Sequence, residues 1–240
     1  MKILAVIPAR IGSTRLLEKP LKKINGKEMI LWVYEGVKES NKIDEIIVAT
    51  DSSKIKDVAE KNGYNAVLTS RDHKTGTDRI CEVVNLSKVD YDIVINVQGD
   101  EPLIKGKDLD KLIKPMIENE SIKVATPIQE MSNDFDNPNS VKVVKDKNDF
   151  ALYFSRSEIP FERGKRDKVY KHIGIYAFRK SFLLNFNKWE QTNLEKSEKL
   201  EQLRILENGY KIKVVVWDSY LHGVDTEKDL KIVEKYLKGE

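Results

Sequence analysis

Cysteine is nearly absent from this sequence, since Cys81 is the only one among 240 residues. A single cysteine excludes a disulfide within the chain and a zinc site built on several thiolates. Long hydrophobic runs are missing too. The apolar run at residues 3–9 is far shorter than the roughly 20 residues of a membrane-spanning helix, and no signal-peptide cleavage pattern follows it. We therefore expect a cytoplasmic protein that does not insert into a membrane.

An excess of one charge sign is also lacking. The 42 Lys and Arg residues and the 39 Asp and Glu residues are interleaved along the chain and give a formal net charge of +3. A nucleic-acid-binding domain usually presents a strongly basic face. We therefore expect no nucleic-acid partner.

Two common nucleotide-binding motifs do not occur. No G-x-G-x-x-G follows the first predicted strand, and no G-x-x-x-x-G-K-[ST] is present anywhere. Their absence disfavours a dinucleotide-dependent oxidoreductase and a P-loop enzyme.

What the sequence does contain is a series of short apolar, β-branched runs. Several are continuous rather than alternating, which is typical of strands buried on both faces. Amphipathic segments of helical length separate the early runs, so the pattern predicts an α/β fold with a mixed, mostly parallel sheet flanked by helices. The predicted strands are 2–8, 45–51, 65–70, 92–98, 123–128, 140–146 and 211–217, and the predicted helices are 28–40, 52–63, 76–86 and 107–120.

The second half of the chain has a different pattern. Further strands at 150–156 and 170–178 follow with fewer helices between them, which predicts a smaller antiparallel insertion or flap. No internal repeat, low-complexity segment or linker interrupts the sequence, so we expect a single domain over 1–240. Asp51, Ser52 and Ser53 are candidate caps for the helix that ends near Gly63.

A basic loop follows the first predicted strand. Ligands of open α/β sheets bind beyond the carboxyl ends of the strands, and Arg10, Ser13, Arg15 and Lys19 supply donors there that suit a polyphosphate. Gly12 would let the backbone approach a ligand closely. The alternative is a solvated basic loop without a ligand.

Acidic residues occur at the end of another predicted strand and at the start of a predicted helix. Asp100 follows the predicted strand 92–98, and Asp225 precedes an amphipathic helix. Mg²⁺ typically binds one or two carboxylates together with substrate phosphate oxygens. Asp225 alone could be only a helix cap. Together, the basic loop and the two acids fit metal-assisted displacement at phosphorus.

Seven blocks of the sequence, taken in order, resemble the 3-deoxy-manno-octulosonate cytidylyltransferase family. They are "IPARIGSTRLLEKPL", "TSRDHKTGTDR", "NVQGDEPLI", "FALYFSRSEIP", "HIGIYAFRKSFL", "LEQLRILENG" and "GVDTEKDL". The first block is shared by nucleotidyltransferases of several sugars, whereas the ordered series is specific. The resemblance implies a Rossmann-like nucleotidyltransferase, usually a homodimer, that joins CTP and 3-deoxy-D-manno-octulosonate (Kdo) to give CMP-Kdo and pyrophosphate with Mg²⁺. CMP-Kdo then enters lipopolysaccharide inner-core synthesis.

The same resemblance implies a role for individual residues. It assigns triphosphate binding to Arg10 and Lys19, assisted by Ser13 and Arg15. It assigns cytosine recognition to Gly76, Thr77 and Gln98. Metal binding falls to Asp100 and Asp225, which with Arg10 and Lys19 form the expected catalytic set. The sugar pocket falls to Arg156, His172, Tyr176, Glu201 and Gln202.

Some of these positions have a structural alternative. His172 lies in an apolar run and could be a strand-end histidine, and Glu201 could be a solvated charge on a helix. Related enzymes commonly have Pro-Gly where this chain has Leu17 and Glu18, which leaves the shape of the phosphate loop open. Outside these sets, the default expectation for His73, His222 and Cys81 is a structural or peripheral role.

Two rival functions remain open. One is the same reaction on another sugar acid, such as 8-amino-Kdo or a sialic-acid-like acid, because one or two hydrogen bonds decide such a choice. The other is a non-catalytic module that binds RNA or another polyanion through the basic loop. Such a module would not need Asp100 and Asp225 in a common site.

Overall fold

In the computed structural model, which describes residues 1–12, 16–164 and 168–239, the chain divides into two units. The first comprises Met1–Asp110 and Ser219–Glu240, and the second comprises Lys111–Asp218. The prediction of a single domain stays a prediction, and each unit is described by itself.

Four parallel strands form the sheet of the first unit. Their order is β5, β4, β1, β6, and the strands are β1 (Ile3–Ala9), β4 (Glu45–Thr50), β5 (Ala66–Leu68) and β6 (Ile93–Asn96). Val6 of β1 pairs with Ile47 on one side and with Asn96 on the other. Every residue of β6, and every residue of β1 except Pro8, is buried, as the continuous apolar runs predict.

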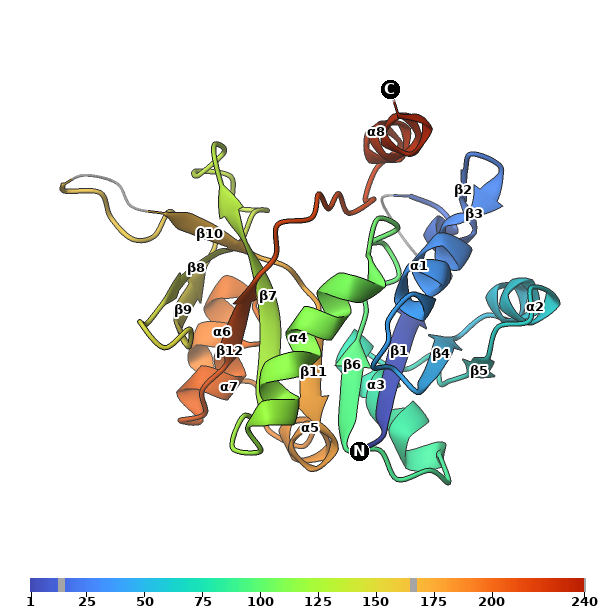
Figure 1. Ribbon diagram of the computed structural model, residues 1–240, viewed down its shortest axis with the longest axis horizontal. Helices are drawn as coiled ribbons and strands as arrows, with labels where there is room; N and C mark the ends of the chain where they lie inside the picture. The colour runs from blue at the N-terminus through green and yellow to red at the C-terminus, as the bar shows by residue number, and fades with distance from the viewer. Residues whose placement is uncertain (13–15, 165–167, 240) are drawn as a thin grey trace. The chain divides into compact units, whose positions relative to one another are not determined.

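Helices cover both faces of this sheet. Figure 1 shows α1 (Met29–Lys38) in front of β1 and α3 (Gly76–Leu86) behind it. The helix α2 (Ser53–Lys61) contacts β4 and β5, and α4 (Gly106–Glu118) begins in this unit. Ser52 occupies the N-cap position of α2, although its side chain makes no capping hydrogen bond, and Gly63 lies just past the end of the helix with φ +77°, as predicted.

A hairpin and the last helix complete the first unit. The short helix η1 (Lys19–Leu21) leads into β2 (Lys23–Ile24) and β3 (Lys27–Glu28). Asn25 and Gly26 both have positive φ, as a two-residue type I′ turn requires. The helix α8 (Glu227–Lys238) contacts β2.

The second unit is built around β7 (Val124–Met131). This strand pairs antiparallel with β10 (Val169–His172) and β11 (Tyr176–Arg179) and parallel with β12 (Lys213–Val216). The strands β8 (Lys142–Lys145) and β9 (Ala151–Ser155) continue antiparallel from β10, which is the antiparallel portion that the sequence predicts. The helices after β11 are α5 (Lys180–Phe186), α6 (Asn193–Glu198) and α7 (Leu203–Glu207).

The prediction of one strand at 170–178 is wrong. The chain bends at residues 173–175, so that β10 and β11 are separate strands. The Ile175 N–H donates to the carbonyl of Ile173 at 2.7 Å, and the hydroxyl of Thr126 donates to the carbonyl of Ile175 at 2.7 Å. These two bonds replace ladder hydrogen bonds at the bend.

Glu201 does not lie on a helix, contrary to the alternative considered for it. Its carbonyl accepts from Arg204 N–H at 3.1 Å in a turn that leads into α7. Among the helices in the described part of the chain, none combines the length and the apolar character needed to cross a membrane.

Gly36 lets α1 pack directly on the chain that follows β6. A Cβ atom at this position would lie 2.2 Å from the carbonyl oxygen of Ile104, which is backbone and cannot rotate away. The helix therefore holds the segment that continues from Asp100.

We predict that Gly36→Ala lowers the free energy of unfolding by about 1–3 kcal/mol through overpacking. Because the added Cβ would meet a backbone oxygen at 2.2 Å, we expect a loss near the upper end of this range, which exceeds the gain of about 1 kcal/mol in helix propensity that alanine brings. Urea denaturation measures it, with exposed Lys38→Ala on the same helix as the control. Equal or greater stability of Gly36→Ala would contradict this packing.

Candidate active site

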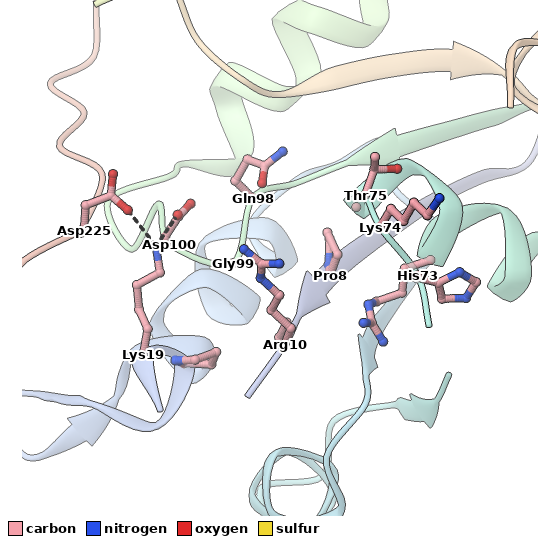
Figure 2. A pocket seen from close by; sticks show the side chains of 14 residues that line it. Pro8, Arg10, Lys19, His73, Lys74, Thr75, Gln98, Gly99, Asp100 and Asp225 are labelled. Carbon is pink, nitrogen blue, oxygen red and sulfur yellow. Dashed lines mark hydrogen bonds and ion pairs between the residues drawn. The ribbon is translucent and has the colours of Figure 1, made fainter. Parts of the chain in front are cut away.

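A cavity of about 320 Å³ lies in the first unit, at the carboxyl ends of β1 and β6 (Figure 2). This volume is within the range of small-molecule sites. The strand β1 is the switch point of the sheet, because α1 connects it to β4 on one side while β6 pairs on its other side. The described residues that line the cavity are Pro8, Ala9, Arg10, Lys19, Pro20, His73, Lys74, Thr75, Gly76, Arg79, Gln98, Gly99, Asp100 and Asp225.

Lys19 bridges the two aspartates of the cavity. Its Nζ lies 2.6 Å from Asp100 Oδ2 and 3.0 Å from Asp225 Oδ1 (Figure 2). Burial lowers the pKa of Lys19, but the charges and hydrogen bonds of Asp100 and Asp225 outweigh burial and hold that pKa above its usual value. The ammonium group therefore stays charged and offsets the repulsion between the two carboxylates.

Backbone contacts bring these three distant residues together. The Val224 N–H donates to the carbonyl of Asp100 at 2.9 Å, which places Asp225 beside Asp100. Lys22 pairs with Glu227 at 3.0 Å, so the segment that carries Lys19 is also tied to the start of α8. The sequence predicts Asp100 and Asp225 as one site, and the structure brings them together.

The alternative of Asp225 as a helix cap is wrong. Thr226 is the N-cap of α8, and its hydroxyl accepts from Asp229 N–H. The Asp229 carboxylate in turn accepts from the backbone N–H groups of Asp225 and Thr226. The carboxylate of Asp225 contacts Lys19 instead of the first turn of the helix.

The wall assigned to cytosine is formed by close backbone packing. A Cβ on Gly99 would lie 2.9 Å from the carbonyl oxygen of Pro8, so the segment 98–100 needs glycine to lie against β1. Gln98 and Gly76 line the cavity, whereas Thr77 is buried and is not one of the described lining residues. Ser13 and Arg15 lie outside the described residues.

Sequence reasoning missed several lining residues. Arg79, Lys74 and Thr75 lie inside the quoted block "TSRDHKTGTDR" but received no role. Thr75 and Asp78 form a capping box that starts α3, and this Thr-x-x-Asp pattern was readable from the sequence. His73, expected to be peripheral, lines the cavity and contacts the carboxylate of Glu82.

The residues assigned to the sugar belong to the second unit. His172 is partly buried beside Thr126, at 3.0 Å from its hydroxyl oxygen, and its ring centroid lies 5.3 Å from that of Tyr176. Burial raises the pKa of Tyr176 far above its usual value, and the charge of Glu201 adds to this effect. The structure thus brings His172, Tyr176 and Glu201 together.

Two other residues that the resemblance assigns to the sugar, Gln202 and Arg156, differ in how their polar groups are bonded. Gln202 is 5% exposed, and its buried Nε2 has no hydrogen-bond partner within the described part of the chain. An unpaired buried donor is costly unless a ligand or water satisfies it. Arg156 instead donates to the carbonyls of Glu198, Pro138 and Lys199 at 2.7, 2.9 and 3.4 Å.

Comparison with known proteins identifies the family. The family model described as Cytidylyltransferase matches residues 4–212. The chain is 49% identical to 3-deoxy-manno-octulosonate cytidylyltransferase of Fusobacterium nucleatum subsp. nucleatum, over 99% of this chain and 98% of that relative. It is also 49% identical to the enzyme of that name from Thermodesulfovibrio yellowstonii, with the same coverage.

The chain belongs to the 3-deoxy-manno-octulosonate cytidylyltransferase family.

Solved structures of similar proteins identify the fold. A structure of CMP:2-keto-3-deoxy-manno-octonic acid synthetase complexed with CTP has a TM-score of 0.95 and 39% identity, and the match covers 100% of this chain and 99% of that one. A 4-diphosphocytidyl-2C-methyl-D-erythritol synthase from Anaerococcus prevotii has a TM-score of 0.68 at 19% identity, which shows a shared fold alone; the match covers 99% of this chain and 98% of that one. The predicted α/β nucleotidyltransferase fold is confirmed.

One departure from the cytidylyltransferase family pattern has a structural explanation. Glu18 stands where the resemblance leads us to expect glycine, and its φ is +49°, in the left-handed region that glycine adopts most easily. The turn before Lys19 therefore forms without glycine, at a cost of about 1–2 kcal/mol in backbone strain. Leu17, in the place of proline, is 75% exposed.

We predict that His172 makes stability depend on pH. Burial lowers its pKa to about 3, whereas the unfolded value is about 6.5. Between these values only the unfolded state binds the proton, so the free energy of unfolding falls as the pH drops below about 6.5. His172→Gln removes this dependence, and urea denaturation from pH 8 to 4.5 measures it.

The difference in the free energy of unfolding between wild type and His172→Gln at pH 7–8 serves as the control. At this pH it reports the change in packing alone, because His172 is neutral in both the folded and the unfolded state. The two curves should converge toward acid pH. Parallel curves over the whole range would contradict the lowered pKa of His172.

Proposed function

We propose that this chain transfers the cytidylyl group of CTP to Kdo and releases CMP-Kdo and pyrophosphate. The observation that carries the proposal is the Lys19 bridge between Asp100 and Asp225, in a cavity of the first unit that Arg10 also lines. The names of the relatives at 49% identity supply the substrates, and CTP is the ligand in the structure of the similar synthetase.

The basic residues of the cavity would bind the triphosphate. Arg10 and Lys19 offer a guanidinium and an ammonium group, which pair well with phosphate oxygens. Ser13 and Arg15 would assist them. Gly76, Thr77 and Gln98 would recognise cytosine through backbone and side-chain hydrogen bonds.

The two aspartates fit Mg²⁺. The described residues contain no cluster of three or more His, Cys, Asp or Glu side chains suited to a metal ion. Mg²⁺ commonly takes only one or two carboxylates and completes its shell with water and phosphate oxygens, so Asp100 and Asp225 would hold it together with the nucleotide. When bound, Mg²⁺ supplies charge neutralisation at the phosphates and favours the ionised form of the attacking hydroxyl.

The reaction is an in-line displacement at the α-phosphorus. The C2 hydroxyl oxygen of Kdo forms the new P–O bond, its proton passes to solvent, and the bond to the β-phosphate oxygen breaks as pyrophosphate leaves. Lys19 exchanges its carboxylate partners for the triphosphate, and Arg10 neutralises charge on the leaving group. Positioning and charge stabilisation supply most of the catalysis in such transfers.

The acceptor would be bound by residues of the second unit. Kdo carries a carboxylate and several hydroxyl groups, which need both cationic and neutral partners. The buried Nε2 of Gln202 supports this role most directly, because a ligand oxygen would satisfy it. Arg156, His172, Tyr176 and Glu201 are the other proposed partners. A homodimer, a cytoplasmic location and a place in lipopolysaccharide synthesis stay predictions.

We predict that Asp100→Asn lowers turnover by about 100-fold or more, because it removes one negative charge from the metal site without opening a core cavity. Pyrophosphate release measures turnover, and thermal unfolding checks that the fold is kept. Asp92→Asn is the matched control, since Asp92 accepts a hydrogen bond from Lys2 N–H away from the cavity. Near-normal turnover of Asp100→Asn would contradict the proposed metal site.

The proposed substrate is tested by pyrophosphate release from CTP and Mg²⁺ with Kdo, with 8-amino-Kdo, with a sialic acid and without acceptor. We expect release that depends on Kdo. Release with another acid alone would keep the reaction and change the substrate. Silence in all four reactions, together with RNA binding that falls steeply with salt, would instead favour a polyanion-binding module.

A further inference from the structure

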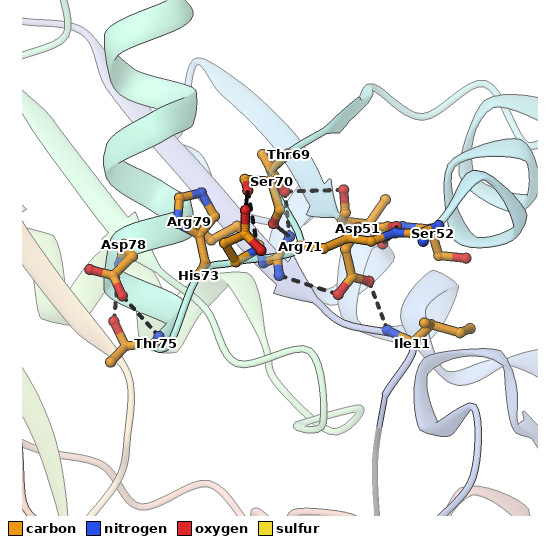
Figure 3. A network of polar contacts seen from close by, with 12 residues as sticks. Ile11, Asp51, Ser52, Thr69, Ser70, Arg71, His73, Thr75, Asp78 and Arg79 are labelled. Carbon is orange, nitrogen blue, oxygen red and sulfur yellow. Dashed lines mark hydrogen bonds and ion pairs between the residues drawn. The ribbon is translucent and has the colours of Figure 1, made fainter.

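The carboxylate of Asp51 joins two walls of the cavity (Figure 3). Asp51 follows the carboxyl end of β4. Its Oδ1 accepts from the Ile11 N–H at 3.0 Å, and its Oδ2 lies 3.4 Å from Nη2 of Arg79. The side chains of Asp51 and Arg79 are 13% and 4% exposed, so solvent screens their ion pair only weakly.

Arg79 belongs to the opposite wall, in the first part of α3. Although it lines the cavity, its guanidinium is bound to the protein frame: Nη1 donates to the hydroxyl of Thr69 and, at 3.2 Å, to the carbonyl of Ser70. Thr69 in turn donates its hydroxyl to the carbonyl of Thr50 at 3.0 Å. Arg79 thus fixes α3 against the end of β4.

The two partners of Asp51 adjoin different parts of the proposed CTP site. Ile11 is the residue after Arg10, which the proposal assigns to the triphosphate. Arg79 shares α3 with Gly76, which is assigned to cytosine. One carboxylate therefore sets the spacing between the phosphate-binding loop and the wall that reads the base.

We propose that Asp51 is a positioning residue that sets the affinity of the cavity for CTP, acting through Ile11 and Arg79. The inference rests on the proposed function. The contacts of Asp51 go to the frame and not to the reacting atoms, so its loss should weaken CTP binding in the ground state and the transition state alike. Such a loss appears as a higher KM with kcat largely kept.

The chain supplies a matched control at the other end of the same strands. Asp44 precedes β4, and its Oδ2 accepts from the Ile3 N–H at 2.7 Å. Like Asp51, it is a carboxylate that ties β1 to the neighbouring strand through one backbone N–H. Its partner lies at the amino end of β1, whereas the cavity lies at the carboxyl end.

The test compares Asp51→Ala, Asp51→Asn and Asp44→Ala with the wild type. Asp51→Ala loses both contacts and should raise KM for CTP by about 10-fold, the size expected for a lost hydrogen bond to a charged group, with kcat within about 3-fold. Asp51→Asn keeps an oxygen for Ile11 but loses the charge that faces Arg79, and should give a smaller rise. Asp44→Ala should leave KM unchanged even where it lowers the melting temperature.

A second readout does not depend on turnover. CTP without acceptor should raise the melting temperature of the wild type and of Asp44→Ala by equal amounts, and that of Asp51→Ala by less. If Asp51→Ala does not fold, Asp51→Asn decides by the same two measurements.

Equal KM and equal CTP-induced shifts in wild type and both Asp51 variants would overturn the positioning role. A fall in the kcat of Asp51→Ala by about 10-fold, without a rise in KM, would overturn it as well. A wild type that neither binds CTP nor releases pyrophosphate would instead overturn the proposed function, so the two failures are distinguishable.

Discussion

The cavity depends on the charge balance between one ammonium group and two carboxylates. Asp100 and Asp225 both contact Lys19, whose positive charge offsets the repulsion between the two carboxylates. The backbone makes the arrangement possible, because Val224 N–H binds the carbonyl of Asp100 and Gly36 lets α1 support the chain beyond it. In the proposed function, a bound triphosphate would give Lys19 new anionic partners and would leave Asp100 and Asp225 to hold Mg²⁺.

The parallel sheet of the first unit explains why the candidate site residues gather at one edge. The carboxyl ends of β1, β4 and β6 lie side by side, so the residues that follow them become neighbours although they are far apart in the sequence. Arg10 and Asp51 directly follow two of these ends, and Asp100 lies in the segment after the third. Because the ends of β1 and β4 are neighbours, Asp51 can also bind the loop after β1 and Arg79 of α3.

Much of this arrangement could be predicted from the sequence, because apolar period and turn residues act locally. The four parallel strands of the first unit and its helices α1, α2 and α3 follow from such patterns, whereas the hairpin of β2 and β3 was missed. The family and the placing of Asp100 and Asp225 in one site came from the resemblance of the sequence blocks. The bend at 173–175 could not, since it depends on the Thr126 hydroxyl from another strand. The roles of Lys19 as a bridge and of Asp51 as a tie also escaped prediction, because each rests on contacts between segments distant in sequence.

The most direct test of the account is a phosphorus NMR measurement of the products formed from CTP, Kdo and Mg²⁺. The account predicts that a phosphodiester signal of CMP-Kdo grows in equal amount with pyrophosphate, because the sugar oxygen attacks the α-phosphorus. Pyrophosphate that accumulates with free CMP and without a phosphodiester would contradict it, since water and not the sugar would then be the acceptor.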